Sequence, residues 1–416
     1  MGAPVEAEVA IVGAGIVGLA TALRLAGEGR DVLVVDAETR DLPASAGNAG
    51  TIAGYNCVPV GTPGVLRSLP RLLLHADSPF AMRWAGLPAL APWLVRFVRE
   101  CLPARARANA AALASLLHDA LADWRDLAMA SGAADLIHRN GSLYVFPDAA
   151  ALADDAWARE RRAAGGVRQV IVGPAEIAAL EPALAGGRGQ GIFFPDAAHI
   201  VDPTDMLCRL REAAAAAGVR FGSGRIDVLQ SEAAGIRLTG PDLAVIGGAV
   251  VIAAGAWSRP LARQAGDTIP LDTERGYHVE YPMAAPPLSR PVCPIRFGVY
   301  LTPMAGRLRA AGTVELGGLE RPPDPRRPAL LDRAARSLLP DLPPPSAHWM
   351  GFRPSMPDSL PVIGRSSLDA RILYAFGHGH LGLTLAAVTA RHVAGLIGGR
   401  QPAETLGAFS PRRFLR

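Results

Sequence analysis

Three glycines and one aspartate near the N-terminus have the types and spacing needed to hold a dinucleotide. Gly13, Gly15 and Gly18 follow a short apolar run, and Asp36 closes the next one. The first glycine permits a tight turn, the second lets the backbone approach a pyrophosphate, and the third lets a helix pack closely on a strand. The Asp36 carboxylate can accept hydrogen bonds from a ribose 2′-hydroxyl, which argues against a cofactor with a 2′-phosphate.

The segments around these residues are the ones that a dinucleotide fold requires. Residues 9–12 form a continuous apolar run, typical of a strand buried on both faces. Apolar residues recur at helical spacing over 16–23, and Gly27 and Gly29 end that helix. A second strand over 32–35 follows. Strand, glycines, helix, strand and acid occur in order, so the sequence predicts a βαβ unit and an α/β protein.

Two more turns of small residues could face a ligand. Ser45–Gly50 follows the second strand, and its alternative interpretation is an ordinary surface loop. Gly377–Thr384 joins a strand over 372–376 to a final helix that ends near residue 397, so a helix N-terminus would point at a polar ligand edge. A buried strand over 249–253 ends in Ala254 and Gly255.

The composition excludes several reaction classes. The chain has 416 residues and no lysine, so its net charge of +4 comes from arginine. A pyridoxal phosphate enzyme, a P-loop NTPase and a protein kinase each need a lysine. Charges of both signs are mixed along the chain, so a nucleic-acid partner is not expected. The length predicts two intertwined domains.

Cysteine and histidine usage predicts reduced thiols and no metal site. The four cysteines are widely spaced, and His378 and His380 have no third ligand candidate nearby in the sequence. We expect no signal peptide, and no apolar run reaches the roughly 18 residues that span a bilayer, so a cytoplasmic protein is predicted. The Leu- and Ala-rich helices expected over 63–130 either pack inward or touch a membrane surface.

The whole pattern resembles the D-amino-acid oxidase-like flavoprotein superfamily, and most closely its bacterial D-amino-acid dehydrogenases. The resemblance covers nearly the whole chain. It rests on the N-terminal glycines and on motifs at 45–50, 275–278, 351–354, 357–364 and 377–384. It implies a split Rossmann-like FAD-binding domain built from 1–55, 201–268 and 351–416. A mixed-sheet α+β substrate domain would comprise 56–200 and 269–350.

The resemblance also implies which residues hold FAD. The pyrophosphate would lie on the first glycine-rich turn, the ribose on Asp36, and adenine against the backbone of Ile226. The 45–50 loop would line the flavin ring, and backbone amides after Gly377 would face its pyrimidine edge, with His380 packed close by. The full set is Gly13, Gly15, Ile16, Val17, Gly18, Asp36, Ala37, Ser45, Asn48, Ala49, Gly50, Ile226, Ala254, Gly255, Gly364, Gly377, Gly379, His380, Leu381, Gly382, Leu383 and Thr384. No cysteine or histidine matches a flavin attachment position, so non-covalent FAD is expected.

On the substrate side, the resemblance implies that Arg353 grips a carboxylate. A planar guanidinium matches a carboxylate with two charge-assisted hydrogen bonds. Tyr277 and His278 would run beside the flavin and contact substrate or an ordered water, and the alternative is that both are packing residues. The implied reaction is hydride transfer from the substrate Cα to flavin N5. It gives an imine that hydrolyses to a 2-oxo acid and ammonia.

The substrate and the electron acceptor stay open at this level. The alternatives to a small D-amino acid are a secondary amine such as D-proline, hydroxyproline or an N-methyl amino acid, a 2-hydroxy acid, and a non-catalytic flavin-binding role. We expect a dehydrogenase, since no lysine is available to stabilise superoxide near the flavin, although an arginine or a protonated His278 could substitute. A quinone or an electron-transfer partner would then accept the electrons, with the protein peripheral at the inner face of the cell membrane.

Overall fold

The N-terminal strand lies inside a sheet that gathers strands from distant parts of the chain. In this computed structural model, which describes residues 3–37, 43–74, 80–82, 87–187, 189–401 and 404–415, β1 is paired in parallel with β2 and β13. β20 lies parallel on the other side of β13. The eight strands are β1 (Val5–Val12), β2 (Val32–Asp36), β10 (Arg220–Ser223), β11 (Val228–Ser231), β12 (Ile236–Thr239), β13 (Ala244–Ile252), β19 (Val362–Arg365) and β20 (Ile372–Phe376).

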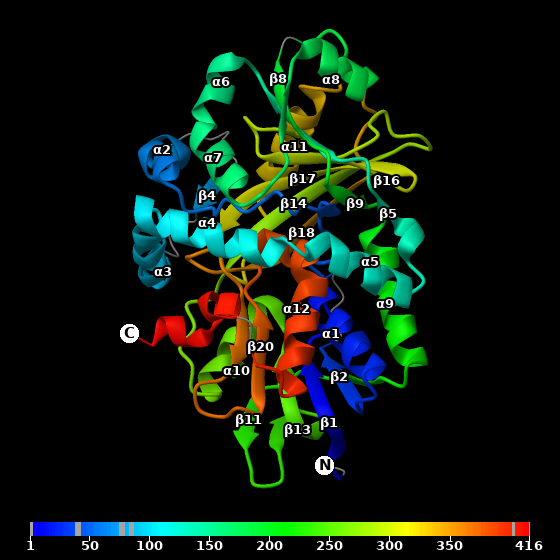
Figure 1. Ribbon diagram of the computed structural model, residues 1–416, viewed down its shortest axis with the longest axis vertical. Helices are drawn as coiled ribbons and strands as arrows, with labels where there is room; N and C mark the ends of the chain where they lie inside the picture. The colour runs from blue at the N-terminus through cyan, green and yellow to red at the C-terminus, as the bar shows by residue number, and fades with distance from the viewer. Residues whose placement is uncertain are drawn as a thin grey trace.

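A second sheet of nine strands lies above the first in the view of Figure 1. Its strands are β4 (Phe80–Met82), β6 (Ser142–Phe146), β7 (Val170–Val172), β8 (Gln190–Phe194), β14 (Asp272–Pro282), β15 (Val292–Pro294), β16 (Val299–Met304), β17 (Arg307–Leu316) and β18 (Ala347–Ser355). A third, small sheet consists of β3 (Thr51–Ile52), β5 (Ile137–His138) and β9 (Ala198–Ile200). The mixed α/β architecture confirms the predicted fold class.

The strands of the first sheet all fall within the pieces 1–55, 201–268 and 351–416, as a split domain requires. β18 ends at Ser355 and pairs with β14 of the second sheet. Residues 351–355 therefore belong to the upper sheet, and the proposed boundary at 351 cuts through a strand. The domain boundaries themselves stay a prediction.

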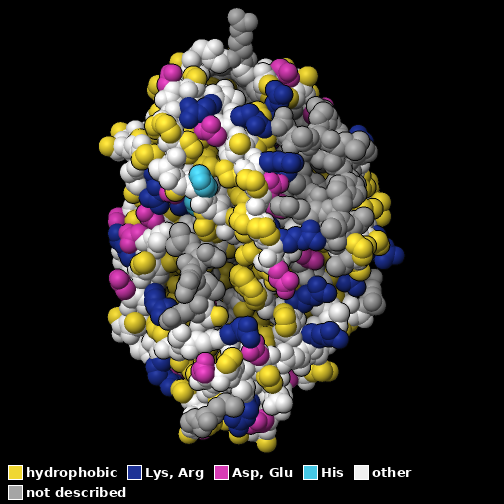
Figure 2. All heavy atoms as spheres, turned by 180° about the vertical axis from the view of Figure 1, so that it is seen from behind, with side chains coloured by type: hydrophobic (Ala, Val, Ile, Leu, Met, Phe, Trp, Pro, Cys, Tyr) yellow, Lys and Arg dark blue, Asp and Glu magenta, His cyan; other side chains and the backbone are white. Residues whose placement is uncertain are grey.

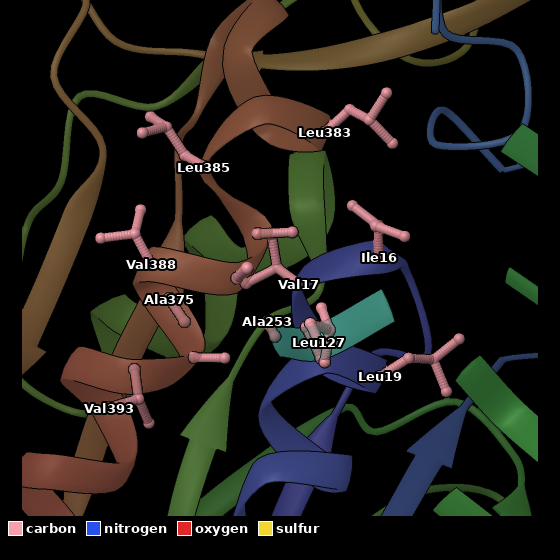
Figure 3. Packing of buried hydrophobic residues seen from close by; sticks show 14 of the residues in the cluster. Ile16, Val17, Leu19, Leu127, Ala253, Ala375, Leu383, Leu385, Val388 and Val393 are labelled. Carbon is pink, nitrogen blue, oxygen red and sulfur yellow. The ribbon is translucent and has the colours of Figure 1, made fainter. Parts of the chain in front are cut away.

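Helices α1 and α12 cover one face of the first sheet and pack on each other. Figure 3 shows Val17 of α1 together with Leu385, Val388 and Val393 of α12 in one cluster of buried hydrophobic residues. Residues 379–397 are long and apolar enough to cross a membrane by composition, but 72% of that window is buried in the protein, as a core helix requires. The helices are α1 (Ile16–Gly27), α2 (Pro63–Leu74), α3 (Leu87–Glu100), α4 (Pro103–Leu117), α5 (Ala120–Ala130), α6 (Ala149–Asp154), α7 (Ala156–Ala164), α8 (Pro174–Leu180), α9 (Pro203–Ala216), α10 (Ser258–Gln264), α11 (Arg326–Arg336) and α12 (Gly382–Ile397).

On the outer surface, charges of both signs are interspersed. Figure 2 shows arginine and acidic side chains mixed over the face opposite to Figure 1, with hydrophobic side chains running along its middle. The net positive charge is therefore not gathered into a single basic patch on this face.

Strand β14 decides which side chains the upper sheet presents to the lower one. Successive side chains of a strand point to opposite faces. Glu274, Gly276, His278 and Glu280 share one face, and the His278 ring reaches the loop after β2, so this face looks toward the first sheet. The other face of β14 packs against α11.

Candidate functional site

The first glycine-rich turn is as tight as its sequence predicts. Gly13 has φ +112°, and a Cβ there would lie 2.5 Å from the Ala253 carbonyl oxygen and 3.0 Å from the Ala254 Cα. A Cβ on Gly18 would stand 1.9 Å from the carbonyl oxygen of Gly13. Any larger residue at either position would push α1 away from β1 and β13, so both glycines are required for the turn.

The amides that follow this turn are positioned to meet an anion. Gly15 precedes α1, and a Cβ added to it would lie 3.6 Å from Ser45 Oγ. The Ile16 N–H donates to Ser45 Oγ at 3.1 Å. No acidic residue stands in the first turn of α1, and Val17 is buried behind it. A helix N-terminus with free amides and a nearby hydroxyl suits a pyrophosphate.

Asp36 lies at the end of β2 beside the same turn. Its Oδ2 accepts from the Ala14 N–H at 2.5 Å, and burial is the main cause that raises its pKa. The Gly224 N–H donates to the Asp36 carbonyl at 2.9 Å, which brings the segment that leads to the buried Ile226 to this end of β2, where Ala37 follows the strand. The arrangement fits the ribose and adenine of FAD.

The loop expected to line the flavin is held by two basic side chains from the upper sheet. Arg309 of β17 donates through Nη1 to the carbonyls of Ala46, at 2.9 Å, and Asn48, at 2.6 Å. His278 Nδ1 lies 3.0 Å from the Gly47 carbonyl oxygen. Three successive carbonyls of the loop are therefore occupied, which leaves its small side chains free to face a flat ligand. We call this set of contacts the loop clasp.

Further contacts shape the same loop. The Gly50 N–H donates to Asn48 Oδ1 at 2.9 Å, and Gly50 has φ +77°. Ala49 is half-buried between them. The Trp349 ring covers Gly47, where a Cβ would meet it at 2.3 Å, so a side chain at this position would displace the indole.

An ion-pair network supports the loop clasp from behind. Arg309 pairs with Glu280 at 2.7 Å, Arg307 pairs with the same carboxylate at 2.9 Å, and Arg307 also reaches Asp202 at 3.1 Å. Burial, followed by the charge of Arg309, lowers the pKa of His278 to about 4. The His278 imidazole is therefore neutral near pH 7, which removes it as a protonated substitute for a lysine.

The turn before α12 brings the C-terminal motif to the same region. Gly377 and Gly379 have φ +81° and +54°, a backbone that favours glycine. Thr384 Oγ1 accepts from the Ala53 N–H at 3.1 Å, which ties the start of α12 to β3. The remaining members of the motif divide by burial: Leu381 and Leu383 are buried, so only their backbone amides could face a ligand, while Gly382 is half-buried.

The two histidines of this turn point to different surroundings. His378 is buried with Nε2 at 3.0 Å from Thr389 Oγ1, inside the core. His380 is half-buried, and burial together with the charge of Arg353 lowers its pKa to about 4. His380 therefore lies near Arg353 and is neutral.

Two glycines predicted to touch the cofactor differ in placement. Gly255, with φ +54°, follows Ala254 at the end of β13 and lies beside the first turn. Gly364 lies inside β19, paired with Tyr374, and a Cβ there would meet Pro411 at 3.3 Å. The C-terminal segment packs against Gly364 here, and its contact with the cofactor stays a prediction.

Arg353 extends from β18 across β14 to β17. A Cβ on Gly276 would stand 2.3 Å from Arg353 Cζ, so the guanidinium lies directly over this glycine. Its Nη1 donates to the Thr313 carbonyl at 2.7 Å and its Nη2 to the Gly312 carbonyl at 3.3 Å. Burial lowers the pKa of Arg353, whereas the nearby Glu274 carboxyl raises it. The guanidinium remains charged, because an arginine does not lose its proton in proteins.

The carbonyls that accept from Arg353 form its seat, and they lie in a strained β-bulge that the sequence did not predict. The register of β14 with β17 shifts between Arg275 and Tyr277, and Thr313 in the shifted part of β17 has φ +58°. A β-branched residue with positive φ is a true outlier, and such strain costs about 1–3 kcal/mol. The signal available was Gly276 of the 275–278 motif, whose missing side chain makes room for the guanidinium.

Tyr277 lies on the opposite face of β14 from His278 and Arg353. Its hydroxyl hydrogen-bonds Glu315 and accepts from the Asp324 N–H at 2.9 Å, and its ring belongs to the core beside α11. Adjacent residues on a strand cannot both face the flavin side. We therefore remove Tyr277 from the candidate substrate contacts and assign it to packing.

Comparisons with known proteins show the family to which the chain belongs. A family model described as DAO, FAD dependent oxidoreductase, matches residues 8–396. The chain is 37% identical to a D-amino-acid oxidase of Bradyrhizobium diazoefficiens, over 99% of this chain and 100% of that protein. It is 34% identical to a D-amino acid dehydrogenase of Paramagnetospirillum magneticum, over 98% and 99%.

The fold is shared with solved structures as well. A glycine oxidase from Geobacillus kaustophilus superposes with a TM-score of 0.76 at 24% identity, covering 98% of this chain and 99% of that one. The expected resemblance and the FAD cofactor are thereby confirmed. The chain belongs to the DAO family of FAD-dependent oxidoreductases.

Proposed function

We propose that this enzyme oxidises a small D-amino acid at the carbon that bears nitrogen. The observation that carries the proposal is the environment of Arg353. Its guanidinium donates to two backbone carbonyls and keeps further N–H donors that can bind a carboxylate. FAD, when bound, supplies the acceptor for the hydride that leaves the substrate Cα. The names of the relatives, D-amino-acid oxidase and D-amino acid dehydrogenase, support this substrate class.

The chain's own residues would contribute position and electrostatics. Arg353 fixes the carboxylate and so orients Cα, and the loop clasp holds the residues that line the flavin. His380 and His278 are neutral, so neither competes with Arg353 for the carboxylate. The imine product then hydrolyses in water to a 2-oxo acid and ammonia.

Replacing Arg353 by leucine tests the proposal. An unpaired buried carboxylate costs about 3–5 kcal/mol, which corresponds to about two to four decades in kcat/KM. FAD should stay bound, as its visible spectrum will show. The control is Arg412→Leu, which removes an exposed arginine and should leave the kinetics unchanged. Near-normal turnover of a D-amino acid by the Arg353→Leu variant would mean that another residue binds the carboxylate.

The same carboxylate grip would serve a secondary amine such as D-proline, hydroxyproline or an N-methyl amino acid, and also a 2-hydroxy acid. A panel of these compounds, each mixed anaerobically with the enzyme, separates the candidates by the rate at which the flavin absorbance bleaches. The proposal predicts the fastest bleaching with a small primary D-amino acid. Bleaching by none of them would favour a non-catalytic flavin-binding protein.

We also propose that the electrons pass to a quinone or a protein partner instead of oxygen. The chain has no lysine, His278 is neutral, and Arg309 is paired with Glu280, so superoxide would find little free positive charge near the loop clasp. Fast reoxidation by a quinone analogue and slow reoxidation by air, after anaerobic reduction with substrate, is the expected result. Air reoxidation as fast as turnover would refute it.

A surface for such a partner would lie on α3 and the two residues that follow it. Val95, Val98 and Leu102 are exposed there, at 59%, 41% and 49%. The rest of the segment 63–100 lies partly outside the described residues. We propose a cytoplasmic protein that touches the inner face of the cell membrane through this helix. Sedimentation with vesicles of anionic lipid, compared between the wild type and a Val95→Ser variant, tests the idea.

A further inference from the structure

Next to Arg353 lies a buried acid that no step so far has used. Glu274 is 6% exposed, and its carboxyl accepts a hydrogen bond from the Ser355 hydroxyl. In the part of the chain that the structure describes, Glu274 forms no direct ion pair with Arg353, although each charge influences the other. Two opposite buried charges therefore stand close together without touching.

The backbone explains why the two side chains are neighbours and yet remain apart. Glu274 and Arg353 are directly opposite in the β14–β18 ladder, so both point to the face that looks toward the first sheet. Arg353 leans over Gly276 to the carbonyls of β17, whereas Glu274 is directed to Ser355. A Cβ on Gly379 would stand 3.9 Å from Ser355 Oγ, so this acid lies beside the turn that precedes α12.

An amino acid carries one charge of opposite sign for each of these two side chains. Its carboxylate and its ammonium are attached to the same carbon, and an unpaired buried charge is costly until a partner of opposite sign arrives. We infer that Glu274 binds the α-amino group of the substrate while Arg353 binds its carboxylate. The inference rests on the proposed function and extends it, since it assigns a specific partner to the amine.

The charged surroundings of Glu274 support this role. Burial raises the pKa of Glu274, the charge of Arg353 opposes this, and Asp272 adds to it. His380 is neutral, because burial and the charge of Arg353 lower its pKa to about 4. A cation arriving next to Glu274 stabilises its ionised form, so binding an ammonium and ionising the acid favour each other. A 2-hydroxy acid brings no positive charge, and the site therefore discriminates against it.

The test uses the FAD-loaded enzyme and compares ligands that differ only in the amine. KM and kcat are measured for D-alanine, and the Kd of propionate, which lacks the amine, is measured from the change in flavin absorbance. Glu274→Gln should raise KM for D-alanine about ten- to hundredfold, the loss expected for one hydrogen bond to a charged group, and change the propionate Kd less than about twofold. Glu320→Gln makes the same charge change at an exposed position and is the matched control, which should alter neither.

Each outcome decides the inference. An unchanged D-alanine KM in Glu274→Gln, or an equal loss for both ligands, overturns it. If that variant fails to load FAD, Glu274→Asp replaces it: a raised D-alanine KM with retained propionate affinity supports the inference, and an unchanged KM overturns it. Failure of the proposed function looks different, because Arg353→Leu would then leave propionate binding intact.

Discussion

Replacing Gly276 by alanine should weaken carboxylate binding by Arg353, although Arg353 itself is not mutated. The new Cβ would stand 2.3 Å from both Cζ and Nη2 of Arg353 and 2.6 Å from Nε. Carbon atoms in contact keep about 3.5–4.0 Å between them, so the guanidinium must move by about 1 Å and release its carbonyl seat on β17. A hydrogen bond to a charged group is worth about 1.5–3 kcal/mol, which corresponds to about a ten- to hundredfold weaker grip on a carboxylate.

The assay is the Kd of propionate together with KM for a D-amino acid, both on the FAD-loaded variant. Gly27→Ala is the control, because a Cβ there would meet nothing within 4 Å and the residue ends α1 far from the substrate. We expect Gly276→Ala to lose affinity for both ligands while the visible flavin spectrum and FAD content stay normal. Wild-type affinity in Gly276→Ala would show that the guanidinium seat has no part in binding, and the reasoning would fail.

Other parts of the site make equally direct predictions. Thr313→Gly removes the strain at φ +58° while keeping the carbonyl that Arg353 uses, so the free energy of unfolding in urea should rise by about 1 kcal/mol with KM unchanged; a stability loss would contradict the strain argument. Arg309→Met breaks the loop clasp, so FAD should dissociate at least tenfold faster on dilution, measured by flavin fluorescence, and unchanged retention would count against the clasp. Burial lowers the pKa of His378 from 6.5 to about 3, so its contribution to stability is present above pH 6.5 and is lost as the pH falls toward 3. At pH 5.5 this loss is about 1.4 kcal/mol, and urea unfolding of His378→Gln should show a smaller drop between pH 7.5 and 5.5 than the wild type. FAD should be released by acid precipitation, and colour kept in the pellet would show a covalent link.

Sequence motifs predicted the residues around the cofactor and only some of the residues around the substrate. Gly13 and Gly18 are read from the sequence because their roles depend on neighbours in one βαβ unit. The seat of Arg353 joins three strands that are far apart in the chain, and nothing near Thr313 in the sequence announces a bulge. The alternation of side chains along a strand could have been applied to the sequence. It predicts that Tyr277 and His278 face opposite sides of the sheet, since they are adjacent in one strand.

Glu274 escaped notice for a related reason. An isolated acid in a strand carries no motif, and only the ladder with β18 shows that Arg353 is its neighbour. The pairing of His278 with the Gly47 carbonyl was equally hidden, because it links residues 231 positions apart. Contacts between sheets depend on register and burial, which a single sequence does not contain.

The order of strands in the lower sheet also governs how the protein is made. β20 ends at Phe376 and lies against β13, and Thr384 bonds to Thr51 across 333 positions of the chain. A ribosome must therefore release nearly the whole polypeptide before the dinucleotide pocket can close. Until then the part of β13 that β20 covers, Val250–Ile252, is unpaired on that edge and can associate with other chains. Cofactor capture is thus a late event in biogenesis, and a chain cut just before β20 should emerge colourless and dependent on chaperones.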